Sequence, residues 1–150
     1  MNGSVTFTGF QQVRMSRILV TGGAGFIASD LAIKLASDPA NDVTVVDNLL
    51  TGDRAKLPAS LPPNLHFIKC DVNRYEDISA VFYAHGFEHV FHYDAVVGVK
   101  RTTDNPVMVL RDIDGLRNVL DLAKNTGVKR VLYSSSSEVY GEPVEFPQNE

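Results

Sequence analysis

The sequence of 150 residues has one cysteine, no tryptophan and no long apolar run. Because a disulfide needs two cysteines, Cys70 excludes an internal bridge, and a reducing compartment such as the cytoplasm suits this composition. Cys70 follows an apolar segment, where a small buried side chain is expected. No apolar run approaches the roughly 18 residues of a membrane span. We therefore expect no membrane partner and a cytoplasmic location.

Positive charge is also scarce and dispersed. The chain carries 14 basic and 18 acidic residues, for a net charge of −4. Proteins that bind nucleic acids concentrate basic residues on one surface, so we expect no nucleic-acid partner. A hydrophobic fraction of 44% is ordinary for one globular domain of this length. Residues 1–16 show no sustained pattern and are expected to form a flexible N-terminal extension before a domain at 17–150.

A glycine-rich segment joins a predicted strand at 18–20 to a helical pattern at 26–36. Between them, the sequence matches Gly-x-Gly-x-x-Ala: Gly23-Ala24-Gly25-Phe26-Ile27-Ala28. Gly23 is expected to turn tightly, Gly25 to leave room for a diphosphate, and Ala28 to let the helix approach the strand. The start of the helix would then offer N–H groups to the phosphates. An ordinary glycine-rich turn is the alternative.

Asp47 ends a second predicted strand, formed by Val43, Val45 and Val46. An acidic residue about 20 positions beyond such glycines can accept hydrogen bonds from the ribose hydroxyls of a dinucleotide. It would repel a 2′-phosphate, so Asp47 favours NAD over NADP. Arg54 keeps NADP open, and a carboxylate that only caps a turn is the alternative.

The remaining pattern alternates strands and helices. It predicts a loop at 48–64, a strand from Leu65 ending at Asp71, and a helix around 78–82 ending by Gly86. It then predicts a strand from Val90 to Ala95, a helix at 105–125 closed by Gly127, and a strand from Val131 ending in Ser134–Ser137. Asp71 and Val72 fit the adenine edge or a simple turn equally well. A metal site at His85 and His89 is not expected, because Gly86 interrupts the helix between them.

This alternation predicts an α/β, Rossmann-type, doubly wound parallel sheet of strand order 3-2-1-4-5. Ligands of such sheets bind beyond the carboxyl ends of the strands, where the order reverses. One crevice should therefore gather Gly22–Gly25, Asp47, His92–Ala95 and Ser134–Glu138. The 105–125 helix is apolar over much of its surface, so it packs either against a partner subunit as well as the sheet, or deep inside one chain.

Four segments, in order, resemble the extended short-chain dehydrogenase/reductases, and more narrowly the NAD-dependent epimerase/dehydratase family acting on nucleotide sugars: Thr21–Ile27, Asp47–Gly52, Asp71–Val72 and Ser135–Gly141. The resemblance implies an NAD site at Gly22, Gly25, Phe26, Ile27, Asp47, Asn48, Asp71, Val72, Ala95 and Ser134. It implies that Ser136 orients the sugar hydroxyl, that Glu138 serves as acid or base, and that the sugar is oxidised transiently at C4. The run from Ser136 to Pro143 looks closest to UDP-glucuronate decarboxylases, with epimerases a near alternative.

The resemblance also implies a homodimer through the 105–125 helix. At four positions, this sequence departs from the family's pattern. The third motif glycine is Ala28, a dehydratase Asp is Ser137, an Ala is Asp94 and a helical Asn is Asp112. The substitution at Ser137 disfavours dehydration. No tyrosine of the chain has a lysine four residues on, although the family's general base is a Tyr-x-x-x-Lys pair. We expect an N-terminal part, truncated before the later strands and the substrate domain and inactive alone. The alternative is a catalytically dead dinucleotide-binding or sensor module.

Overall fold

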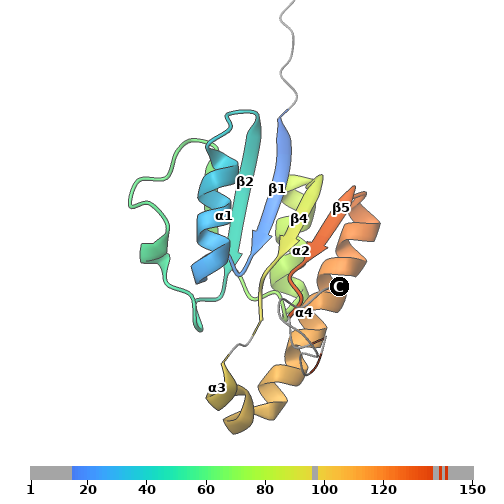
Figure 1. Ribbon diagram of the computed structural model, residues 1–150. Helices are drawn as coiled ribbons and strands as arrows, with labels where there is room; N and C mark the ends of the chain where they lie inside the picture. The colour runs from blue at the N-terminus through green and yellow to red at the C-terminus, as the bar shows by residue number, and fades with distance from the viewer. Residues whose placement is uncertain (1–14, 96–97, 137–138, 140, 142–150) are drawn as a thin grey trace, which may run out of the picture.

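The computed structural model describes residues 15–95, 98–136, 139 and 141 (Figure 1). The predicted extension, apart from Met15 and Ser16, and the predicted site residue Glu138 lie outside the described residues. The order of the elements is β1 (Ser16–Thr21), α1 (Phe26–Ala36), β2 (Asn41–Asp47), the 3₁₀ helix η1 (Arg54–Lys56), β3 (Leu65–Lys69), α2 (Tyr75–His85), β4 (His89–His92), α3 (Val99–Asp104), α4 (Pro106–Thr126) and β5 (Arg130–Tyr133). β1 begins one residue before the predicted domain boundary.

The five strands form one parallel sheet in the order β3-β2-β1-β4-β5, which confirms the predicted topology. β1 lies at the centre of the sheet, with β2 on one side and β4 on the other. α1 covers one face, and α2 and α4 cover the other (Figure 1). The carboxyl ends of β1, β2 and β4 therefore meet where the strand order reverses, at the start of α1.

Small residues bring α1 close to the sheet. The buried face of the helix consists of Ala28, Ser29, Ala32 and Ala36. Leu35 packs against the same core from the edge of this face, whereas Phe26 is 85% and Ile27 65% exposed. The predicted helix is therefore confirmed, and its first two apolar residues lie outside the buried face. Alanine's small side chain allows the close helix–strand approach expected of Ala28.

α4 packs by one face only. Gly115, Val119, Leu122 and Ala123 are buried, whereas Val107, Leu110, Ile113 and Leu120 are 48–63% exposed. A helix buried deep inside this chain, one of the two predicted alternatives, is therefore wrong. Gly127 closes α4 in the left-handed conformation, as predicted (φ 77°).

Three strand ends and two short helices differ from the sequence-based predictions. β3 ends at Lys69 rather than Asp71, β4 at His92 rather than Ala95, and β5 at Tyr133 rather than in Ser134–Ser137, while η1 lies in the predicted loop 48–64. The six-residue α3 was not predicted, because a helix of fewer than two turns gives no apolar period. Among the described residues, no helix is long and apolar enough to cross a bilayer.

Candidate functional site

The turn between β1 and α1 depends on three glycines in a way that differs in part from the sequence prediction. Gly22, not Gly23, adopts the left-handed conformation, with φ +64°. A Cβ on Gly22 would lie 2.8 Å from the backbone nitrogen of Asp94. A Cβ on Gly23 would overlap Val45 Cγ1. Gly22 therefore makes the turn, and Gly23 allows it to pack on β2.

The start of α1 suits an anion. Its N-cap is Gly25, which provides no side-chain cap, and the first turn carries no acidic residue. A Cβ on Gly25 would lie 2.9 Å from the carbonyl oxygen of Gly22, so the tight turn itself requires glycine there. Uncapped N–H groups and the positive end of the helix dipole together favour a phosphate. The residues of this turn therefore fit a diphosphate group.

Asp47 connects the end of β2 to the glycine-rich turn. Its Oδ2 accepts a hydrogen bond from the backbone amide of Ala24 at 3.0 Å, and its Oδ1 accepts one from Leu49 at 2.7 Å. The side chain is 5% exposed. The following loop lies close over it, since a Cβ on Gly52 would approach the carboxylate oxygens to 2.6 and 2.7 Å. The carboxylate thus holds the turn and the loop together, in addition to the ribose role predicted for it.

The loop after β2 is also anchored to the turn. Asp53 donates its backbone amide to the carbonyl oxygen of Ala24 at 2.9 Å. Arg54 donates to the carbonyl oxygens of Leu57 and Pro58, and its guanidinium lies 5.4 Å from the centre of the Phe67 ring. Arg54 is therefore engaged within its own loop, which weakens the case for a 2′-phosphate ligand.

Two adjoining hollows lie at the carboxyl ends of the strands. The first, which we call the turn cleft, has a volume of about 570 Å³. It is lined by nine of the twelve predicted site residues: Gly22, Gly25, Phe26, Ile27, Asp47, Asn48, Ala95, Ser134 and Ser136. The sheet therefore brings together segments that are far apart in sequence, although the individual roles of these residues stay predictions.

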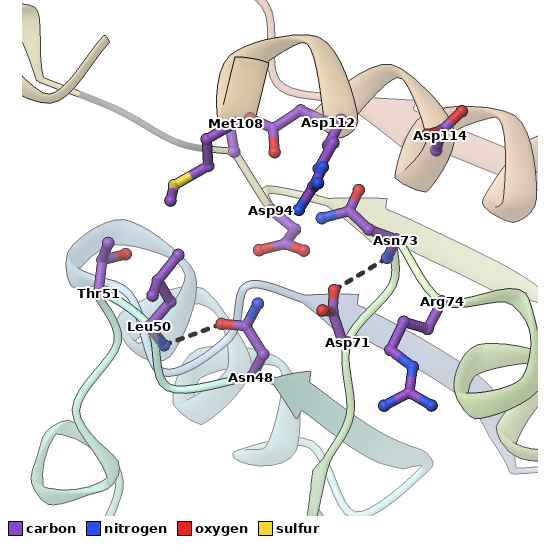
Figure 2. Close-up of a pocket in the computed structure, with 12 residues that line it drawn as sticks. Asn48, Leu50, Thr51, Asp71, Asn73, Arg74, Asp94, Met108, Asp112 and Asp114 are labelled. Carbon is purple, nitrogen blue, oxygen red and sulfur yellow. Dashed lines mark hydrogen bonds between the residues drawn. The ribbon is translucent and has the colours of Figure 1, made fainter. Parts of the chain in front are cut away.

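The second hollow, which we call the acidic pocket, has a volume of about 440 Å³ and receives Asp71, Asp94, Asp112 and Asp114. Figure 2 shows the carboxylate of Asp94 between Asn48 on one side and Asp112 on the other. Asn48, Thr51, Asp94 and Ala95 line both hollows. A ligand that extends from one hollow into the other must therefore pass Asp94.

Asp71 and Val72 play different parts. Asp71 lines the acidic pocket and accepts a hydrogen bond from the backbone amide of Asn73 at 3.0 Å, as a turn residue does. The side chain of Val72 is 2% exposed and lies in the core with α2 and α4. Only the backbone of Val72 could therefore face a ligand, and its carbonyl oxygen already accepts a hydrogen bond from Asn118 at 2.9 Å.

His92 lines the turn cleft, as predicted, but its pairing with Thr21 was not predicted. His92 Nδ1 lies 2.7 Å from the hydroxyl of Thr21, and the His92 ring stacks on Tyr133 at 5.8 Å. Burial lowers the pKa of His92 to about 4, so the ring is neutral at pH 7. The signal in the sequence is a polar residue at the end of each of two neighbouring apolar strands. The pair fixes the ends of β1 and β4, from which the glycine-rich turn and Asp94 follow.

Asp94 is the group whose ionisation the site alters most. Burial, and then the charges of Asp47, Asp112 and Asp71, raise its pKa from 3.8 to about 7. All these influences act in the same direction, because each disfavours a further negative charge. The Asp94 carboxyl is therefore close to half protonated at neutral pH.

Comparisons with known proteins agree with this geometry. Residues 18–150 match the family described as the NAD dependent epimerase/dehydratase family. The chain belongs to this family. Among its relatives, UDP-arabinose 4-epimerase 1 of Arabidopsis thaliana is 34% identical over 142 residues, which are 91% of this chain and 34% of the relative. UDP-glucuronic acid decarboxylase 6 of the same plant is 37% identical over 136 residues, which are 89% of this chain and 37% of the relative.

Solved structures that are similar to this chain share its fold. UDP-glucose 4-epimerase of Thermotoga maritima, solved with UDP-glucose, has a TM-score of 0.76 and 34% identity, covering 86% of this chain and 41% of that one. WbmG of Bordetella bronchiseptica, solved with NAD and UDP, has a TM-score of 0.78 and 30% identity, covering 89% and 41%. The chain thus spans about a third of the length of the curated relatives it matches.

Membership of the epimerase/dehydratase family confirms the resemblance inferred from the four motifs, and the family is NAD-dependent. The two departures that add acids, Asp94 and Asp112, line the same pocket. Sequence order alone could not show this, because the two residues lie on different elements and meet only when α4 packs on the sheet.

Proposed function

We propose that this chain is the NAD-binding region of a nucleotide-sugar epimerase or decarboxylase. One observation carries the proposal most directly. The Asp47 carboxylate lies 3.0 Å from the Ala24 amide, beside the glycine-rich turn that opens α1. A phosphate-binding helix start and a ribose-binding carboxylate are thereby within one cleft.

Each part of the cleft would hold one part of the cofactor. The amides at the start of α1 would bind the diphosphate, and the remaining lone pairs of Asp47 would accept hydrogen bonds from the adenosine ribose. Asp71, two residues beyond the end of β3, would face the adenine side. When bound, NAD supplies a hydride acceptor for the sugar carbon. Asp47 and the engaged Arg54 favour NAD over NADP.

Ser136 would hold the sugar. It lines the turn cleft beyond β5, where its hydroxyl could orient the hydroxyl at sugar C4. Glu138, which lies outside the described residues, would act as acid or base after oxidation at C4. Relatives at nearly equal identity are named as UDP-arabinose 4-epimerases and UDP-glucuronic acid decarboxylases. We therefore propose epimerisation or decarboxylation as the second step, on a UDP-type sugar.

The 150 residues alone would not complete this reaction. Oxidation at C4 needs a base to remove the hydroxyl proton, and no tyrosine here is followed by lysine four positions on. The second candidate, a dinucleotide-binding module without chemistry, is favoured by Asp94, which stands where the resemblance to the family implies Ala. An open reading frame with Tyr-x-x-x-Lys after Glu150 distinguishes the enzyme from the module.

α4 would form a homodimer interface with a second copy of the chain. Its exposed apolar side chains, at Val107, Leu110, Ile113 and Leu120, lie opposite the buried face. Exposed apolar side chains of this kind are costly to leave in water. The dimer stays a proposal, as does the cytoplasmic location expected from the sequence.

Isothermal titration calorimetry with NAD and NADP tests the cofactor assignment. We expect the wild-type chain to bind NAD weakly and more tightly than NADP, and Asp47→Ala to bind NAD less tightly. Asp42→Ala, on the same strand but at the opposite end of the sheet, is the control and should bind as the wild type does. Equal binding of NAD by all three proteins would contradict the assignment.

A further inference from the structure

Asp94 lies at the boundary between the turn cleft and the acidic pocket. Its backbone nitrogen and Cα are 2.8 and 2.9 Å from the position of a Cβ on Gly22, so Asp94 touches the glycine-rich turn. It lines both the turn cleft and the acidic pocket, and its carboxylate points into the latter (Figure 2). A dinucleotide that places its diphosphate at the start of α1 and extends its adenosine toward Asp71 would therefore pass Asp94, with its diphosphate in a hollow that Asp94 lines.

The groups around Asp94 disfavour the ionised form of its carboxyl group. β2 contributes Asp47, and α4 contributes Asp112, while β4 itself contributes the neutral His92. The other charged or titratable groups that line the two hollows are Asp71, Arg74, Arg111, Asp114, Tyr93 and Tyr133. The influences on the Asp94 carboxyl all raise its pKa, to about 7 before any ligand is bound. A diphosphate would add further negative charge and raise it more.

We propose that a dinucleotide occupies this site only together with a proton on Asp94, so that pH controls cofactor affinity in this chain. The inference rests on the proposed function. In the binding step, the Asp94 carboxylate takes one proton from solvent and becomes a neutral carboxyl group, while the dinucleotide keeps its charge. The neutral group no longer repels the diphosphate, and its O–H can donate a hydrogen bond. The family's Ala at this position would leave affinity without this dependence.

The sign of the effect follows from linkage. Below pH 7, Asp94 is already protonated, and affinity should change little with pH. Above pH 7, each binding event must take up a proton, so the dissociation constant for NAD should rise up to about tenfold per pH unit. Binding at pH 8 should take up close to one proton.

Calorimetric titration of the chain with NAD between pH 6 and pH 8.5, in two buffers of different ionisation enthalpy, measures both quantities. We expect the wild type to show the pH-dependent affinity and the proton uptake. Asp94→Asn, which keeps the shape and removes the charge, should bind NAD with less than about a twofold change over this range and take up no proton. Asp114→Asn is the matched control, because it removes one charge from the rim of the same pocket at an exposed position. It should keep the wild-type pH dependence.

Other outcomes would contradict the inference, and they distinguish its failure from failure of the proposed function. If Asp94→Asn keeps the pH dependence of the wild type, the inference is wrong and the proposed function stands. If adding MgCl₂ at pH 8 raises the affinity of the wild type for NAD to its value at pH 6, a cation neutralises the pocket and the inference is wrong. If neither protein binds NAD at pH 6, the proposed function and the inference both fail. Carbon-13 NMR of the Asp94 carboxyl without ligand is independent of binding, and a titration near pH 4 would overturn the inference by itself.

Discussion

The carboxylate of Asp47 accepts a hydrogen bond of 3.0 Å from the backbone amide of Ala24, 23 residues earlier in the chain. The bond joins the carboxyl end of β2 to the glycine-rich turn after β1. Since the Asp47 side chain also receives the Leu49 amide at 2.7 Å, one buried carboxylate satisfies two backbone donors on opposite sides of the site. Asp47 is therefore both a structural residue and the proposed ribose ligand.

Replacing Asp47 should destabilise the fold as well as weaken the cofactor site. Asp47→Ala leaves two backbone amides without their acceptor, and an unsatisfied buried donor costs about 1–3 kcal/mol. Urea unfolding should show a loss of this size. Asp42→Ala removes the same charge from the same strand, where the side chain lies 2.9 Å from Nε2 of the half-exposed His66. It should change the free energy of unfolding much less. Equal losses in the two variants would contradict the account.

Gly22 should be harder to replace than Gly127, although both have positive φ. A left-handed conformation costs a non-glycine residue about 1–2 kcal/mol. Gly127→Ala incurs only that strain, because no atom lies within 4 Å of its Cβ position. Gly22→Ala adds a clash with the backbone of Asp94. Urea unfolding should therefore show a larger loss for Gly22→Ala, and similar losses in both variants would show that the turn can relax.

Asp94 and His92 should make opposite contributions to stability as pH changes. The pKa of Asp94 is about 7 when folded, against an ordinary 3.8, so its contribution falls as pH rises from about 4 to 7. The pKa of His92 is about 4 when folded, against 6.5, so its contribution rises between those values and is lost as pH falls. Each slope is at most about 1.4 kcal/mol per pH unit, and the two oppose each other in the shared window.

Asp94→Asn should reveal this compensation. The variant keeps the pH-dependent contribution of His92 and loses that of Asp94. Its free energy of unfolding relative to the wild type should therefore grow from about pH 4 to about pH 7 and stay constant above pH 7. Urea unfolding of both proteins at several pH values measures the difference. A difference that does not change with pH would mean that Asp94 ionises normally in the folded chain.

The exposed face of α4 should make the chain self-associate. Light scattering at high concentration should give a mass approaching twice 16.4 kDa for the wild type. Leu110→Glu places a charge at the centre of the exposed apolar face and should return the mass to that of a monomer. Ile33→Glu, on α1 at the other face of the sheet, should still self-associate. A wild-type monomer at all concentrations would contradict the proposed dimer.

The sheet and much of the site could be predicted because their signals are local. Buried strands are short apolar runs, the glycine-rich turn is contiguous, and Asp47 follows directly from the end of β2. The order of parallel strands then follows from general rules of connection. These signals suffice to predict that Asp47, Ala95 and Ser134 line one cleft, as they do.

The parts that could not be predicted depend on packing. Whether Gly22 or Gly23 makes the turn depends on how closely Asp94 and Val45 approach. The exposure of Phe26 follows from the small alanine face on which α1 packs. The convergence of Asp94 and Asp112 requires α4 to lie across the end of β4. Each is a contact between elements, which a pattern within one element cannot reveal.

The most direct test of the central claim is a titration of the ¹⁵N-labelled chain with NAD at pH 6, followed by NMR of the backbone amides. If the glycine-rich turn and Asp47 form the dinucleotide site, saturable shifts should be largest for residues 22–27 and 47–48. Shifts should be smaller with NADP at the same concentration. Absence of saturable shifts at these amides, or shifts confined to other parts of the chain, would contradict the account.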